Sequence, residues 1–427
     1  MENDGINRDS VGDFKGLRIT QLDDDDDEDY GGEAEAAPEP IAIDEVDDDD
    51  EDEDEDEDEP VTLGFVEKPK CKWSLLRQMF PHKAGGFPAW LDPINLPSGR
   101  SILCDICEEP LHFVLQVYAP IMDKESAFHR TLFLFMCPSM SCLLRDQHEQ
   151  WKRAPEKARR SVKVFRCQLP CNNPFYSSEP PKHDGSDKPL GDGAALCSWC
   201  GTWKGDKSCG NCKRAKYCSQ KHQALHWRSG HKSECQQLSI IVETSDSNSV
   251  NNGIALSRSQ KVACKSLWQE YELVNVDECE YDTEMSEDDE LSKSLVSRGV
   301  VDDKMKSLMD DFEGDADRKS WASFQERIAK APEQVLRYCR SPSAKPLWPM
   351  ASGRLSKADI PKCSSCSGTL CFEFQVLPQL LYYFGVKNDA DSLDWATIAV
   401  HTCENSCDSG VSYKEEFAWV QLYNQTA

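Results

Sequence analysis

Cysteine spacing constrains the fold of this chain more than any other feature of its sequence. Twenty-one cysteines occur among 427 residues, and most of them fall in short-spaced pairs. The N-terminus has no apolar signal segment and no apolar run reaches about 18 residues, so we expect no membrane span and a place in the cytosol or nucleus. Disulfides are rare in those reducing compartments, where paired cysteines more often bind metal. We therefore expect zinc.

The densest group of cysteines lies at residues 197–235, with the spacing C-x2-C-x8-C-x2-C-x5-C-x3-H-x8-H-x3-C. Eight ligands of this kind predict two tetrahedral zinc sites, because each structural site takes four Cys or His side chains. A fully occupied tetrahedron has no open position for water or substrate, so these ions should be structural and not catalytic. The predicted ligands are Cys197, Cys200, Cys209, Cys212, Cys218, His222, His231 and Cys235.

The strings "YCSQKHQALHW" and "GHKSEC" in this segment resemble the MYND zinc finger. That resemblance implies two interleaved sites and an adaptor that binds a peptide, often one containing proline. His222 stands where many MYND fingers have Cys, and His226 is an alternative ligand. The implied ligand sets are Cys197, Cys200, Cys218 and His222 for one zinc, and Cys209, Cys212, His231 and Cys235 for the other.

A second cysteine pattern occurs twice, once on each side of the finger. Cys104 and Cys107 precede the strand-like "HFVLQVYAP", and Cys363 and Cys366 precede "FEFQVLPQL". Both runs contain F-x-x-Q-V, and a second cysteine pair follows each. This repetition predicts two related β-rich halves packed as a pseudo-dimer. Each quartet either holds one further zinc or consists of reduced thiols packed as small hydrophobic groups. The closing pairs are Cys137 with Cys142, and Cys403 with Cys407.

Charge and composition divide the rest of the chain. The acidic runs 23–29 and 47–59 contain twenty of the excess negative charges, which leaves −8 of the net −28 for the remainder. Self-repelling, weakly apolar blocks do not fold, so a disordered acidic tail is expected. The predicted fold class is α+β and β-rich. The predicted segments are 1–60 acidic tail, 61–176 N-terminal half, 197–235 finger, 236–330 acidic and partly helical linker, and 331–427 C-terminal half. Helical patterns are expected at 302–312 and at 320–339.

Catalytic signatures are missing from the sequence. There is no P-loop, no G-x-S-x-G elbow, no dinucleotide fingerprint and no segment resembling a SET methyltransferase core, so we expect no enzyme. Trp90 and Trp395 are expected in the core. The acidic runs exclude attraction to nucleic acid or to an anionic membrane, and they either steer a basic partner or serve only as a solvated tail.

In order along residues 61–422, "LGFVEKP", "GGFPAWLDP", "CDICEEPLHFVLQVYAP", "FHRTLFLFMCP", "VFRCQLPCNNPFYS", "CFEFQVLPQLL", "LDWATIAVHTC" and "EEFAWVQ" resemble the programmed cell death protein 2 family. The acidic tail is similar to that of plant members. The resemblance implies a bipartite β-rich fold with an inserted MYND finger. It also implies a dedicated chaperone that captures a newly made small-subunit ribosomal protein and delivers it for nuclear assembly in ribosome biogenesis. The alternative is a nuclear MYND adaptor in transcriptional regulation.

Overall fold

A computed structural model describes residues 60–152, 159–237, 262–282, 316–387, 389 and 391–423. The predicted tail 1–60 therefore lies outside the described residues except for Pro60, as does much of the predicted linker. The strands are β1 Thr62–Glu67, β2 Lys83–Ala84, β3 His112–Tyr118, β4 His129–Met136, β5 Val162–Leu169, β6 Lys207–Ser208, β7 Lys216–Tyr217, β8 Tyr271–Asp277, β9 Leu336–Tyr338, β10 Leu370–Val376, β11 Thr397–Cys403 and β12 Tyr413–Gln421. The helical elements are η1 Arg77–Met79, η2 Glu125–Ala127, α1 Met140–Trp151, α2 Gln220–His226, η4 Trp227–His231, α4 Cys279–Asp282, α6 Ala316–Ala329, η6 Lys357–Asp359 and α7 Gln379–Tyr383.

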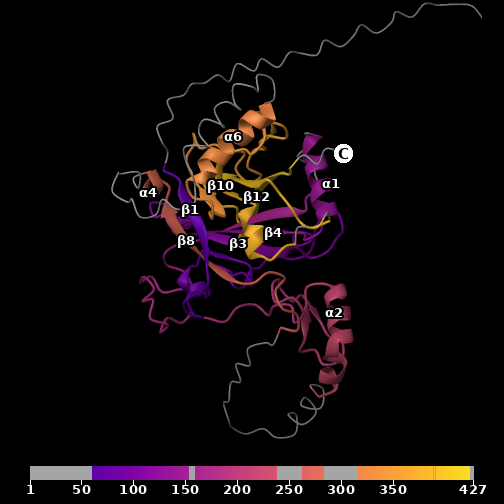
Figure 1. The fold of residues 1–427 in the computed structure, drawn as a ribbon. Coiled ribbons are helices and arrows are strands. Elements are labelled where there is room, and N and C mark those ends of the chain that lie inside the picture. The colour runs from indigo at the N-terminus through magenta and orange to yellow at the C-terminus, as the bar shows by residue number, and fades with distance from the viewer. Residues whose placement is uncertain are drawn as a thin grey trace, which may run out of the picture. The chain divides into compact units, whose positions relative to one another are not determined.

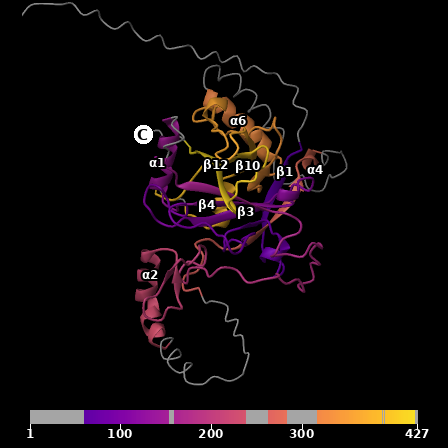
Figure 2. The ribbon, with the colours of Figure 1, turned by 180° about the vertical axis from the view of Figure 1, so that it is seen from behind.

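Ten strands from both halves close into one barrel, in the order β1-β8-β2-β3-β4-β5-β12-β11-β10-β9. Strands β3 and β4 of the first half and β10 and β12 of the second lie together in both views (Figures 1 and 2). All pairs in the barrel are antiparallel. The two predicted halves are therefore not separate sheets stacked on each other, because each supplies strands to one continuous wall.

Strands β1 and β8 join the two halves on one side of the barrel. Strand β1, from the first half, pairs with β9 of the second half, whereas β8, from the segment between the finger and the second half, pairs with β2 of the first half. Strands β1 and β8 also pair with each other, from Thr62 opposite Asp277 to Glu67 opposite Glu272. On the far side of the barrel β5 pairs with β12. Neither half can complete its strand order without the other.

The repeated glutamine explains much of the shared motif. Gln116 of β3 accepts a hydrogen bond from the backbone N–H of Ala89 (2.8 Å), and Gln375 of β10 accepts one from that of Leu347 (2.6 Å). Each amide group also donates to a nearby backbone carbonyl, of Pro81 and Leu347 respectively. The held segments both read Pro-x-Trp, with Ala89 and Leu347 at the central position. Two residues before each glutamine the ladder register shifts, which marks a β-bulge.

Alternation along the strands separates two apolar layers. One cluster contains Leu132, Leu134 and Met136 of β4 together with alternate residues of the other barrel strands. A second contains the opposite face of β4, with Phe133 and Phe135. This period of two is what β-strands impose on side-chain direction. Trp395 is buried in the first cluster and Trp90 in the second, which agrees with their expected core positions.

Several elements differ from the sequence-based expectation. Strand β8 arises within residues expected to form an acidic linker, and α1 was not expected. The segment from Ser320 was expected to continue as a helix to Cys339, but α6 ends at Ala329 and β9 follows. Pro332 explains this end, since proline lacks an N–H and disfavours a helical residue before it. The helix expected at 302–312 lies outside the described residues. No helix among the described residues has the length and apolarity needed to cross a bilayer.

A buried ion pair crosses the barrel interior between the halves. Arg130 of β4 and Glu373 of β10 are both fully buried, and the guanidinium contacts both carboxylate oxygens, one of them at 2.7 Å. Thr402 and Tyr338 also donate to Glu373. The nearby Arg130 charge holds the pKa of Glu373 below its ordinary value, although burial alone would raise it.

Glu373→Gln should lower the free energy of unfolding by about 3 kcal/mol, because it leaves the Arg130 charge buried and uncompensated. Chemical denaturation of the full chain measures this. Glu149→Gln, which removes only the exposed partner of Lys152, should change stability by less than about 0.5 kcal/mol. Equal, small effects of both substitutions would show that the cross-barrel pair does not support the fold.

Candidate zinc sites and the docked finger

The structure brings the eight predicted finger ligands into the two expected groups. Cys197, Cys200, Cys218 and His222 form one group, called finger site 1, and Cys209, Cys212, His231 and Cys235 form the other, called finger site 2. Within each group the ligand atoms all lie within 4.8 Å of one another. Their chemistry and number fit a closed tetrahedral site, so zinc would fold the module and leave no position for substrate.

Local backbone features place the two histidines. The Ser219 side chain caps α2 by accepting a hydrogen bond from the backbone N–H of His222 at 3.1 Å, which fixes the first turn that carries this ligand. Gly230, with φ of 149°, breaks the helical path just before His231. Only glycine adopts that conformation readily, so Gly230 allows the change in chain direction that places His231 in finger site 2.

His226, the alternative ligand, lies outside both finger sites. Its Nδ1 atom is 3.1 Å from the hydroxyl of buried Tyr217, and its ring stacks on that of His231 at 4.8 Å. Burial lowers the pKa of both His226 and His231, which keeps them neutral. A neutral ring is the form in which histidine binds a metal. His231 offers such a ring to finger site 2, whereas His226 contacts the hydroxyl of Tyr217.

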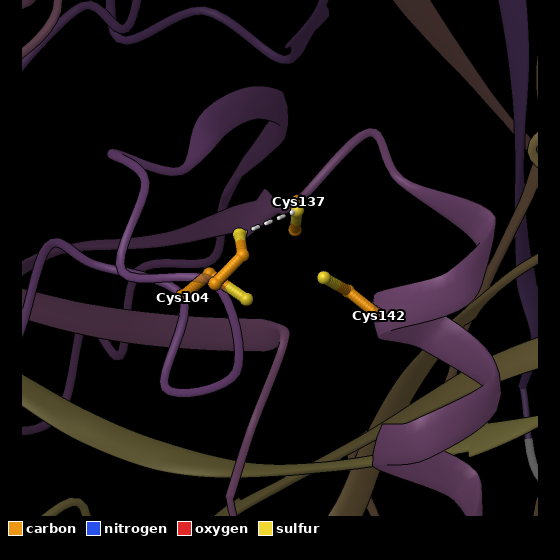
Figure 3. Close-up of side chains that lie close together, drawn as sticks. Cys104, Cys137 and Cys142 are labelled. Atoms are coloured by element: carbon orange, nitrogen blue, oxygen red, sulfur yellow. Dashed lines mark hydrogen bonds between the residues drawn. The ribbon is translucent and has the colours of Figure 1, made fainter. Parts of the chain in front are cut away.

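The cysteines of each barrel half also converge. The N-terminal quartet is Cys104, Cys107, Cys137 and Cys142, and the C-terminal quartet is Cys363, Cys366, Cys403 and Cys407. Ligand atoms within each quartet again lie within 4.8 Å of one another. Figure 3 shows the side chains of Cys104, Cys137 and Cys142 close together, with Cys142 projecting from the first turn of α1.

All four C-x2-C pairs share one backbone turn. In each, the residue four positions after the first cysteine donates its N–H to that cysteine's carbonyl, at 2.8 to 2.9 Å. That residue has positive φ in every case, and three of the four are not glycine: Glu108, Lys213 and Ser367, alongside Gly201. Non-glycine residues rarely adopt this conformation, and it persists where the surroundings demand it. The barrel quartets thus share the local turn of the finger pairs and are compatible with zinc.

The finger is joined to the first half by a buried tryptophan. Trp203 is 0% exposed, and its ring centroid lies 4.3 Å from that of Phe135 on β4. Its indole N–H donates to the carbonyl of Leu111 at 2.9 Å. In return Trp90 donates its indole N–H to the carbonyl of Thr202 in the finger, also at 2.9 Å. The finger is an insertion in sequence, but it completes the second apolar layer of the barrel.

Sequence reasoning missed Trp203, although "CGTWKG" lies between two ligand pairs. A metal-binding loop this short has no core of its own that could bury a large aromatic residue. The presence of Trp203 in the loop therefore indicates that the finger packs against another part of the chain. Lys414 of β12 was also missed. Its Nζ atom lies 2.8 Å from Cys363 Sγ, and nothing in the local sequence places a lysine beside a cysteine 51 residues away.

The fold and sites define a class of protein: a β-barrel with four groups of cysteine or histidine side chains, two of them in an inserted MYND finger. Matching families are described as Programmed cell death protein 2, N-terminal domain (residues 60–183), MYND finger (197–235) and Programmed cell death protein 2, C-terminal putative domain (318–422). The chain belongs to the programmed cell death protein 2 family.

Individual relatives agree with this assignment. Bovine programmed cell death protein 2 is 37% identical over 369 residues, which cover 85% of this chain and 96% of that protein. Human programmed cell death protein 2-like is 27% identical over 356 residues, covering 79% and 89%. Ubiquitin carboxyl-terminal hydrolase 16 of Arabidopsis thaliana shares only 38 residues, 4% of its length, so its activity does not bear on this chain. No solved structure matches the chain.

Trp203→Ala should lower the free energy of unfolding of the barrel by about 3–5 kcal/mol, because it opens a cavity in the layer around Phe135. Thermal or urea unfolding followed by the barrel's tryptophan fluorescence measures the loss. The matched control is Trp227→Ala in the same finger, where the side chain is 40% exposed. If both substitutions leave the barrel equally stable, the finger folds as an independent appendage.

Proposed function

We propose that this protein is a chaperone for a small-subunit ribosomal protein, which it captures in the cytosol and delivers to the nucleus for ribosome assembly. Family membership and net charge support the proposal. The chain belongs to the programmed cell death protein 2 family over both halves and the finger. A net charge of −28 suits a basic, RNA-binding client, since opposite charge accelerates encounter and masks the client's surface.

Closure of the barrel limits the ways in which the protein could bind a client. Because the ten barrel strands close on themselves, the barrel offers no open end of the strand order to which a client strand could add. Capture is therefore assigned to the outer surface and connecting segments of a preformed body, with the acidic tail providing attraction. Such attraction acts over a Debye length of about 8–10 Å, so salt should weaken it. No catalytic step is required.

In this proposal zinc is a structural cofactor, with two ions in the finger and one in each barrel half. Purified protein should contain four zinc ions per chain by elemental analysis. Cys363→Ser combined with Cys403→Ser should remove one ion, because two of the four ligands of the C-terminal quartet are lost. If the unaltered chain and the double variant each contain two zinc ions, then zinc is bound only in the finger and the barrel quartets are packed, reduced thiols.

A nuclear transcriptional adaptor is the second candidate. Trp227, which is 40% exposed on the finger, is the observation that favours it, because an exposed aromatic side chain can anchor a peptide. In this case the finger, and not the barrel or the tail, would carry the binding site.

Affinity capture of the tagged full chain from cells, followed by quantitative mass spectrometry, tests the two functions. A chaperone should recover one small-subunit ribosomal protein at close to equal amounts, and recovery should fall as salt rises. The client should also be recovered as a nascent chain on translating ribosomes. Trp227→Ala should leave this recovery unchanged.

The opposite pattern would overturn the chaperone proposal. Recovery of chromatin regulators that is lost in Trp227→Ala would assign the adaptor function. Deleting the whole finger is a poor test, because it would also remove Trp203 from the barrel. Point substitution of an exposed residue keeps the barrel intact.

A further inference from the structure

The two barrel quartets have different electrostatic surroundings. A zinc ion bound by four thiolates carries a net charge of −2, which buried surroundings disfavour unless cations or N–H donors compensate it. In the C-terminal quartet the Nζ atom of Lys414 lies 2.8 Å from Cys363 Sγ and 4.0 Å from Cys407 Sγ. The lysine side chain is only 5% exposed, so solvent screens this charge weakly.

Lys414 is held in place by groups from both halves. Its Nζ atom lies 3.4 Å from the Glu416 carboxylate, which also accepts a hydrogen bond from Arg166 Nε at 2.6 Å. The other Glu416 oxygen accepts from the backbone N–H of Cys403 at 3.3 Å. Arg166 lies on β5 of the first half and donates to the carbonyl of Cys407 at 3.0 Å. The charges of Arg166 and Glu416 cancel each other. The charge of Lys414 is therefore the net positive charge beside the sulfur atoms of the C-terminal quartet.

The N-terminal quartet has no such donor. The nearest buried lysine, Lys163, contacts the Asp105 carboxylate at 2.9 Å instead of a sulfur atom. Arg159 donates to the backbone carbonyls of Asp105 and Ile106. In the part of the chain that the structure describes, no lysine or arginine donates to the sulfur atoms of this quartet. Each quartet has one exposed cysteine, Cys107 in the first and Cys366 in the second, so exposure does not favour the N-terminal quartet and the charge of Lys414 is the difference between them.

We propose that Lys414 is a positioning residue for zinc in the C-terminal quartet, and that the N-terminal quartet, which lacks it, is the site that reacts first with electrophiles and releases its metal. The inference rests on the proposed zinc content of both quartets. An N–H donor withdraws charge from the thiolate it contacts and makes it a weaker nucleophile. Residues in this outer position typically change metal affinity 10–100-fold.

Competitive alkylation of the full, zinc-loaded protein tests the inference. The protein is treated with iodoacetamide in the presence of a chromophoric zinc chelator, and mass spectrometry follows alkylation at each cysteine. In this reaction the thiolate sulfur forms a bond to carbon, the carbon–iodine bond breaks and iodide leaves, and the neutral thioether that results no longer holds zinc, which passes to the chelator. In the unaltered chain, Cys104 and Cys107 should react before Cys363 and Cys366. Lys414→Met should accelerate alkylation of the C-terminal quartet about tenfold, with zinc release at the same rate, and leave the N-terminal quartet unchanged.

Two variants separate this role from a general effect on folding. Lys414→Arg keeps a charged donor and should restore slow alkylation. Lys83→Met is the matched control, since Lys83 is 2% exposed and its side chain contacts Glu270, not a cysteine. An unchanged C-terminal rate in Lys414→Met, or equal acceleration by Lys83→Met, would overturn the inference.

The same experiment distinguishes failure of the zinc assignment. If the quartets bind no zinc, their cysteines will be alkylated without any corresponding zinc release, and elemental analysis will find only the finger ions. If they bind zinc but react in the opposite order, the zinc assignment stands and the role given to Lys414 is wrong.

Discussion

Closure of the barrel depends on strands β1 and β8, which pair with each other and join the first half to the second. An open sheet would leave unpaired backbone groups along both edges, and burial of such groups is costly. These two strands satisfy the edges, because β1 covers β9 and β8 covers β2. The approach is close, since a Cβ at Gly64 of β1 would lie 2.9 Å from that of Leu336 on β9. The two related halves thereby form one closed fold, where each alone would remain open.

The two halves differ in what packs against their outer faces. Both keep the glutamine that holds a Pro-x-Trp segment and both keep a cysteine quartet. Only the first half receives Trp203 from the finger, against the aromatic surface of Phe135 and Phe165. The second half instead places its own Trp348 near Phe372 and Ala399. The inserted finger is thus part of the first half's packing.

Much of this architecture could be predicted from local sequence. Strands β3, β4, β5, β10 and β11 fall within segments rich in aromatic and β-branched residues. The eight finger ligands follow from the spacing of cysteine and histidine, whereas their division into two sites is what the resemblance to the MYND finger implies. Strand β8 could not be found in this way, because "YELVNVD" carries two acids and its partners are more than 180 residues away. Helix α1 was not predicted, because it starts within the pair Cys137 and Cys142 and its second half, "RDQHEQ", has no apolar residue to show a helical period. Trp203 and Lys414 act through contacts that only the closed barrel creates.

The buried polar contacts are concentrated where the halves meet. Arg130 reaches Glu373 across the interior, and Arg166 reaches Glu416 across the β5–β12 seam. Apolar packing alone tolerates sliding of one strand against another, whereas a buried charge is satisfied in a single register. These pairs therefore select one alignment of the two halves. Because the Arg166 and Glu416 pair also contacts the C-terminal quartet, the alignment that closes the barrel is the same one that completes the surroundings of that site.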